Sequence, residues 1–253
     1  MSNQPSAVLI HGLSETREVW WRQVAHLEQS MRVVAYDIRG FGSSPTGAAD
    51  GTVRQFADDL GQLLSAFGTG PAWLVGFSMG GVIAQRFALD FPQLTRGLVL
   101  VASSCSVGRA GQEFFHHRIE QVTGGGLESL AKTNDGDARG CFYTDNEELI
   151  NEYKQLRVGA VRDPAGYVNA CNAMLSLGEN PLTPVLCAIG CPTLVVAGEH
   201  DPYCPPKASK MISDAIPGAE LEIIDDVGHC IQFEASDALN EHIAAFVRRH
   251  KDT

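Results

Sequence analysis

The sequence predicts an α/β protein in which helices cover both faces of a mostly parallel sheet. Helical patterns separate the first four strand-like runs, as expected when helices join parallel strands. The runs are continuously apolar rather than alternating, which is typical of strands buried on both faces. We therefore expect about six strands. The runs that predict them lie at 7–10, 32–36, 73–75, 98–102, 193–197 and 221–224.

Three helices are expected between the first four strands. Apolar residues recur at helical spacing over 20–29. Thr52 and Gln55 have the form of a capping box, which predicts a helix that begins there and continues to about Phe67. A third helical pattern, over 82–89, follows a glycine-containing turn.

Composition limits the kinds of protein that fit this chain. Its 253 residues are 44% hydrophobic, enough for one large core. The net charge of −11 and the lack of a basic patch argue against a nucleic acid or a membrane as partner. The first six residues lack a signal-peptide pattern, so we expect a cytoplasmic protein that binds a small molecule. The seven cysteines fit reduced thiols, and we expect no metal or other cofactor. The sequence leaves the oligomeric state open.

After the fourth strand the alternation stops. Residues 104–188 have the pattern of successive helices. We interpret them as a helical cap inserted over the carboxyl edge of a core formed by 1–103 and 189–253. Three breaks are expected to separate the cap helices: Gly124–Gly126, Asn134–Gly140 and Asp163–Pro164. The glycine triplet has no lysine after it, so it predicts a flexible turn rather than a phosphate loop.

The pentapeptide G-F-S-M-G at 76–80 lies between an apolar run and a helical pattern. A serine at such a strand-turn-helix junction has a strained backbone that lifts its hydroxyl clear of the sheet. The flanking glycines remove side chains that would collide where strand and helix approach. Ser78 is therefore the candidate nucleophile. Because so short a motif also arises by chance, its partners must support it.

A serine nucleophile needs a histidine to take its proton and a carboxylate to orient that histidine. Asp201 and His229 follow the last two predicted strands and so belong to the same sheet edge as Ser78. Asp201 is the preferred acid because it lies a few residues past a strand end. Asp226 is so near His229 in sequence that it would need an unusual turn. The acids that compete with Asp201 are Glu199, Asp225 and Asp226.

The first strand is followed by His11-Gly12-Leu13, which begins a turn at this same edge. An oxyanion hole needs two backbone donors close to the reacting carbonyl, and we expect them to be the N–H groups of Leu13 and Met79. His11 is interpreted mainly as a hydrogen-bonding brace of this turn, with contact to the substrate as the alternative.

Other charged and apolar residues have two interpretations each. Asp37 and Arg39 are expected to tie the glycine-containing loop 37–44 to neighbouring backbone. His116, His117 and Arg118 form the densest cationic group of the cap, either a solvated helix face or a grip on a substrate carboxylate. Apolar cap residues would line the pocket if their helices face inward: Phe114, Phe115, Phe142, Tyr143 and Met174.

The order Ser78, Asp201, His229, together with His11-Gly12 and loop 37–44, resembles the α/β-hydrolase superfamily over nearly the whole chain. This resemblance implies the α/β-hydrolase fold and a Ser-His-Asp triad without a cofactor. Most members have two antiparallel strands before the His-Gly strand, whereas only six residues precede it here. We therefore expect a sheet with a shortened edge.

A narrower resemblance rests on two short strings. The segment from D-P-A-G-Y at 163–167 to Ala170-Cys171, and G-E-H-D-P-x-x-P-P at 198–206, are similar to 3-oxoadipate enol-lactonases. Serine rather than aspartate at the turn disfavours the relatives that dehalogenate alkanes or open epoxides.

The function that we expect is a serine hydrolase that cleaves a small ester or lactone through an acyl-enzyme. One alternative uses the same triad to hydrolyse a carbon-carbon bond of a ring-cleavage product. An alternative of another class is a non-catalytic ligand receptor on a hydrolase scaffold. The fold alone does not distinguish these functions.

Overall fold

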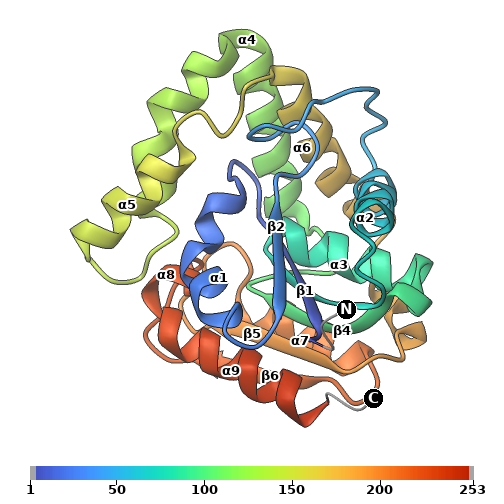
Figure 1. Ribbon diagram of the computed structural model, residues 1–253. Helices are drawn as coiled ribbons and strands as arrows, with labels where there is room; N and C mark the ends of the chain where they lie inside the picture. Colours follow the sequence, from blue (N-terminus) through green and yellow to red (C-terminus); the bar gives the residue numbers. More distant parts are fainter. Residues whose placement is uncertain (1–3, 251–253) are drawn as a thin grey trace.

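The computed structural model describes residues 4–250 (Figure 1). Six strands within these residues form one sheet of order β2-β1-β3-β4-β5-β6, and every neighbouring pair is parallel. This confirms the predicted α/β fold and its number of strands. In chain order the strands are β1 (Ser6–Ile10), β2 (Arg32–Tyr36), β3 (Ala72–Phe77), β4 (Thr95–Val101), β5 (Thr193–Gly198) and β6 (Glu220–Ile224).

The strand order reverses direction at β1. The chain first passes to β2 on one side, and the later strands then extend the sheet from β3 on the other side. The loops after β1 and β3 therefore diverge at the carboxyl edge, and a crevice at such a switch point is where open α/β sheets bind their ligands. Ser78 follows β3, and the His11-Gly12-Leu13 turn follows β1.

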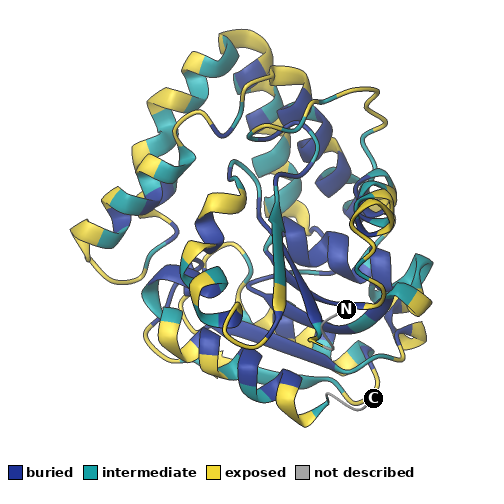
Figure 2. Cartoon of the chain, viewed as in Figure 1, coloured by how far each residue is buried: buried dark blue, intermediate teal, exposed yellow. Residues whose placement is uncertain are grey.

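Both faces of the sheet are apolar, which explains why the strand runs are continuous. Val8 and Leu9 are both fully buried, but Val8 belongs to one core cluster and Leu9 to the other. Successive side chains of a strand point to opposite faces, so each face has its own core. Strands β1 and β3 are accordingly buried throughout, whereas edge strand β2 is partly exposed (Figure 2).

Helices cover the two faces of the sheet. On one face, α2 (Val53–Phe67) and α3 (Met79–Asp90) contribute to the core, and on the other, α1 (Trp21–Leu27) and α9 (Ser236–Arg249) do so. The remaining short elements outside residues 104–188 are η1 (Arg17–Trp20), η2 (Pro92–Leu94), α7 (Pro206–Ala215) and α8 (Ile231–Glu234). Among the described residues, no helix is both long and apolar enough to span a membrane.

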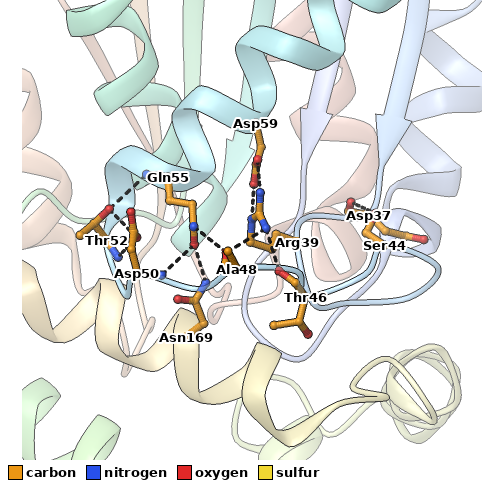
Figure 3. A network of polar contacts seen from close by, with 10 residues as sticks. All are labelled: Asp37, Arg39, Ser44, Thr46, Ala48, Asp50, Thr52, Gln55, Asp59 and Asn169. Atoms are coloured by element: carbon orange, nitrogen blue, oxygen red, sulfur yellow. Dashed lines mark hydrogen bonds and ion pairs between the residues drawn. The ribbon is translucent and has the colours of Figure 1, made fainter.

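The start of α2 agrees with its sequence signal. Thr52 Oγ1 accepts a hydrogen bond from the backbone N–H of Gln55 at 3.2 Å, the first half of a capping box. The Gln55 side chain instead accepts from the N–H of Asp50 at 3.3 Å and donates to the carbonyl of Ala48 (Figure 3). Gly68 ends the helix in the left-handed conformation, with φ 58°.

Loop 37–44 is held by the polar contacts that its charges predict (Figure 3). Arg39 forms a bidentate ion pair with Asp59 of α2, at 2.5 and 2.6 Å, and donates to the carbonyl of Thr46 at 2.7 Å. The carboxylate of Asp37 accepts from the backbone N–H and the hydroxyl of Ser43, both at 2.9 Å. These residues shape the loop, as expected.

Residues 104–188, which we call the helical segment, lie between β4 and β5 in sequence and over one end of the sheet in space (Figure 1). Their helices contact one another, α4 with α5 and with α6. The elements of this segment are α4 (Arg109–Arg139), α5 (Glu147–Arg157), α6 (Pro164–Glu179) and η3 (Thr183–Ala188).

Of the breaks expected in the helical segment, the one at Gly124–Gly126 is confirmed, and the one at Asn134–Gly140 begins later than expected. The glycine triplet separates two helical stretches within α4, because Gly126 leaves helical geometry with φ 60° and ψ −160°. The second stretch folds back on the first, since Arg118 donates to Thr133 at 3.0 Å and Gln121 donates to the carbonyl of Ser129 at 2.8 Å. The stretch from Asn134 stays helical as far as Arg139. The side-chain amide of Asn134 has hydrogen-bond partners on α5, since it donates to the carbonyl of Lys154 at 3.2 Å and accepts from Arg157 at 3.1 Å.

Candidate active site

Ser78 lies at the junction of β3 and α3 with φ 52° and ψ −118°, a conformation that a non-glycine residue rarely adopts. The surrounding backbone enforces it. A Cβ atom on Gly80 would overlap the carbonyl oxygen of Ile10, and one on Gly76 would overlap the carbonyl of Gly80. The N–H of Ser78 donates to the carbonyl of Val101 at 2.9 Å. The glycines of the pentapeptide therefore permit the tight approach of strand and helix that presents this serine.

Asp201 and His229 meet at the carboxyl edge, three residues beyond β5 and five beyond β6. His229 Nδ1 lies 2.7 Å from Asp201 Oδ2, and both residues are buried. Oδ1 of Asp201 accepts from the backbone N–H groups of Tyr203 and Cys204 at 2.8 and 2.9 Å. The carboxylate is thus fixed on both oxygens. With Nδ1 donating to it, Nε2 of His229 is left as the proton acceptor.

The surroundings of His229 favour its charged form. Burial opposes charging, but the carboxylate of Asp201 outweighs burial through its charge and hydrogen bond, so the pKa of His229 is raised above its ordinary value of 6.5. The imidazole also contacts two rings, with centroid distances of 4.8 Å to Phe77 and 5.2 Å to Tyr203. These contacts leave it little freedom to turn.

Ser78 and His229 line one cavity of about 620 Å³, together with Leu13 and Met79. Met79 is the first residue of α3, where backbone N–H groups have no intrahelical partner. The cavity therefore brings together the candidate nucleophile, the candidate base and the two residues expected to supply the oxyanion hole. Asp201 lies behind His229.

The turn after β1 is held by His11. The backbone N–H of Ile38 donates to His11 Nε2 at 3.0 Å, so Nδ1 carries the proton and donates to the carbonyl of Gly12 at 2.8 Å. Burial lowers the pKa of His11 to about 4, which keeps the ring neutral. The carbonyl of Gly12 and the N–H of Leu13 belong to the same planar peptide unit. His11 therefore also orients the Leu13 N–H, in agreement with its interpretation as a brace.

The helical segment closes the cavity with some of the expected residues. Phe114, Phe115 and Met174 line it, as predicted. The same prediction is wrong for the two residues that follow α4. Phe142 packs against Tyr153 in the core, with 5.6 Å between ring centroids. Tyr143 is half-exposed and stacks on His200 at 3.8 Å. Both differ because the chain turns back toward the His229 loop here, with Cys230 N–H bonded to the Cys141 carbonyl at 2.9 Å.

The cationic group of the helical segment is divided. Arg118 is buried and lines the cavity, but its guanidinium pairs with Asp137 and donates to Gln121 and Thr133 at 2.9 and 3.0 Å. His116 and His117 are exposed on the outer side of α4 and lie outside the residues that line the cavity.

The polar cavity residues that were not singled out from the sequence include Glu15, Tyr153 and Arg157. Glu15 and Tyr153 are buried, Arg157 is partly buried, and hydrogen bonds connect all three. Tyr153 and Arg157 lie one helical turn apart in a charged stretch, which by itself resembles a solvated helix face. In the sequence, Glu15 lies in a loop and has no pattern around it that predicts burial. Only the packing of α5 against the β1 turn makes them part of the site.

One group of described side chains has the chemistry of a metal site: Glu199, His200 and Asp226. All are exposed, and His200 Nε2 lies 3.3 Å from Glu199 Oε2 and 4.0 Å from Asp226 Oδ1. They lie outside the cavity lining of the described chain. Exposed acids often cluster without binding an ion, so we assign no metal to them.

Fold and site together define an α/β-hydrolase, and the chain belongs to this family: residues 5–236 match the family model described as alpha/beta hydrolase fold. It is 26% identical to 3-oxoadipate enol-lactonase 2 of Acinetobacter baylyi, over 98% of this chain and 90% of that protein. The enol-lactonase structure from Burkholderia xenovorans is 25% identical with a TM-score of 0.88, covering 98% of this chain and 92% of that one. A thermophilic esterase from Thermogutta terrifontis is 27% identical with a TM-score of 0.85, covering 99% and 92%. The protein is thus a hydrolase of this family.

Proposed function

We propose that the protein is a serine hydrolase that cleaves a small carboxylic ester or lactone. The observation that supports this most strongly is the buried pair of His229 and Asp201, 2.7 Å apart, beside a strained Ser78 in one cavity. A buried charge pair and a strained backbone each cost free energy, and a role in activating a serine nucleophile would account for both.

In the proposed mechanism, Nε2 of His229 takes the proton of the Ser78 hydroxyl as its oxygen attacks the substrate carbonyl carbon. The negative oxygen of the tetrahedral intermediate accepts hydrogen bonds from the N–H groups of Leu13 and Met79. The intermediate then collapses to the acyl-enzyme, and the alcohol leaves with the proton held by His229. For a lactone, that alcohol remains part of the acyl group.

Water completes the cycle. His229 takes a proton from a water molecule, whose oxygen attacks the acyl-enzyme carbonyl through a second tetrahedral intermediate. Its collapse returns the proton to Ser78 and releases the carboxylic acid. Asp201 stays ionised throughout, because its role is to hold the His229 tautomer and to stabilise the imidazolium.

The walls of the cavity support a small substrate. We propose that the helical segment acts as a cap, because Phe114, Phe115 and Met174 contribute apolar surface to the lining of the cavity. A volume of about 620 Å³ suits a small acyl or cyclic ester better than a triglyceride. The names of the relatives, two enol-lactonases and an esterase, support the same class of reaction.

Labelling by a fluorophosphonate probe, followed by intact mass measurement, tests whether an activated serine is present. We expect one adduct, located on Ser78 by peptide mapping, and no adduct after heat denaturation. A receptor on a hydrolase scaffold would remain unlabelled. A panel of small esters, lactones and dienone ring-cleavage products then selects the reaction, and turnover of the dienones alone would replace ester cleavage by carbon-carbon hydrolysis.

A further inference from the structure

The turn that precedes the expected oxyanion donor is anchored by a carboxyl group that ester hydrolysis itself does not require. Glu15 is fully buried. Its Oε2 accepts from the backbone N–H of Gly12 at 2.8 Å, and its Oε1 accepts from the hydroxyl of Tyr153 at 2.6 Å. Burying a carboxylate is costly unless its oxygens are satisfied, so this arrangement requires both donors.

Glu15 and His11 together fix two successive peptide units. Glu15 holds the N–H of Gly12, and His11 holds the carbonyl of Gly12 at 2.8 Å. The second of these peptide units contains the N–H of Leu13. The following residue, Ser14, has φ 63°, which is uncommon for a residue other than glycine. A turn with such a residue keeps its shape only if its neighbours impose it.

The helical segment supplies the other side of this anchor. Tyr153 of α5 is buried, and its hydroxyl also accepts from Nη1 of Arg157 at 3.1 Å. Nε of Arg157 donates to Asn134 of α4 at 3.1 Å. A continuous chain of hydrogen bonds thus runs from the turn after β1, through Glu15 and Tyr153, into two helices of the segment.

A second contact keeps α5 in place on the core. Glu152, the neighbour of Tyr153, pairs with Arg22 of α1 through both oxygens at 2.6 and 2.7 Å and accepts from Trp21 at 2.8 Å. The position of the Tyr153 hydroxyl is therefore set by the fold. It does not depend on Glu15 alone.

We propose that Glu15 and Tyr153 are positioning residues that set the direction of the Leu13 N–H. The helical segment would then contribute to stabilising the transition state as well as enclosing the substrate. This inference rests on the proposed serine-hydrolase function. It differs from a substrate-binding role, because neither side chain is needed to touch the substrate.

Positioning an oxyanion donor has a characteristic kinetic effect. The negative oxygen exists in the transition state and not in the bound ester, so a misdirected donor lowers kcat/KM without weakening ground-state binding. Removing a whole oxyanion donor costs roughly 10²- to 10³-fold in rate. We expect about 10²-fold for Glu15→Ala and about tenfold for Tyr153→Phe, which keeps the Glu15-Gly12 bond. Glu15→Gln retains one acceptor for the Gly12 N–H and should fall between them.

The test compares three measurements on the full-length protein: kcat/KM for p-nitrophenyl acetate, inhibition by phenylboronic acid, and inhibition by acetanilide. The boronate forms a tetrahedral adduct with the serine, and the amide imitates the bound ground state. We expect the boronate inhibition constant to rise in proportion to the loss of kcat/KM across the three variants. The acetanilide constant should stay within about twofold. Matched controls are Glu18→Gln, an exposed acid after the same turn, and Tyr143→Phe, a half-exposed tyrosine of the segment.

Several outcomes would overturn the inference. Variants that behave like the controls, or lose acetanilide affinity as much as boronate affinity, would show that the turn is not positioned by these residues. If Glu15→Ala does not fold, Tyr153→Phe, which deletes one oxygen, decides by the same criteria. A wild-type protein that neither turns over the ester nor binds the boronate would refute the serine hydrolase itself, which is a separate result.

Discussion

Asp201 Oδ2 and His229 Nδ1 lie 2.7 Å apart although the two residues are 28 positions apart in the chain. Asp201 follows β5 and His229 follows β6, and these strands are parallel neighbours, so their loops end side by side. Asp226 is much nearer to His229 in sequence. It is nevertheless exposed with φ 56°, and its carboxylate lies near His200. The sheet, not proximity in sequence, pairs the acid with the histidine.

The first prediction distinguishes the two acids. Asp201→Asn keeps the shape of the side chain but no longer stabilises the His229 tautomer that donates from Nδ1, so kcat should fall about 10⁴-fold. Asp226→Asn should stay within about twofold of the wild type. Steady-state kinetics on one ester measures both. A larger loss for Asp226→Asn than for Asp201→Asn would show that Asp201 is not the acid of the triad.

The second prediction concerns pH. His229 acts as a base only when neutral, and the charge of Asp201 raises its pKa above 6.5 despite burial. The acid limb of the kcat/KM profile should therefore have its midpoint above 6.5, with activity rising as pH increases through it. The measurement uses a neutral ester, so that the substrate does not titrate. A midpoint below 6.5 would contradict the raised pKa.

How far the sequence predicts this protein depends on how local each feature is. The strand runs and the Ser78 turn follow from neighbouring residues, because burial and backbone conformation are encoded within a few positions. The choice of Asp201 needed only the rule that parallel strands end at one edge. The continuation of α4 past Asn134 depends instead on acceptors and donors supplied by α5. The same holds for Glu15, whose partner Tyr153 is 138 positions away.

A third prediction compares two glycines. A Cβ on Gly80 would overlap the carbonyl of Ile10, whereas a Cβ on Gly136, within α4, meets nothing within 4 Å. Gly80→Ala should lower the free energy of unfolding by roughly 1–3 kcal/mol and abolish turnover by displacing Ser78. Gly136→Ala should stabilise the protein by roughly 0.5–1 kcal/mol, as alanine does in a helix interior.

Chemical denaturation and ester turnover of both variants provide the measurement. Equal stability of the two alanine variants would mean that β1 and α3 do not approach as closely as described. Retained turnover in Gly80→Ala would mean the same for the Ser78 turn.

The fourth prediction is that Arg118 binds the negative charge of an anionic substrate. Its guanidinium is engaged by Asp137, so the ion pair as a whole faces the cavity. Arg118→Ala should raise KM for an anionic lactone at least about tenfold, because a charge-assisted hydrogen bond is worth roughly 1.5–3 kcal/mol. Asp137→Asn should lower the same KM by releasing the cation.

A neutral lactone of similar size is the control, and its KM should change little in either variant. Equal effects on both lactones, or none on either, would remove Arg118 from the binding site. Preference of the wild type for neutral esters over every anionic lactone would favour a general carboxylesterase.

The central proposal is that Ser78 is the nucleophile, and its removal tests this most directly. Ser78→Ala deletes the attacking oxygen but little packing, so the melting temperature should be preserved while ester turnover falls by about 10⁴-fold or more. The measurement is the steady-state rate of ester hydrolysis by purified Ser78→Ala protein. The variant is expressed and purified separately from the wild type, so that no wild-type enzyme contaminates it. Loss of turnover with an intact fold is the predicted result. Turnover close to that of the wild type would contradict the assignment of Ser78.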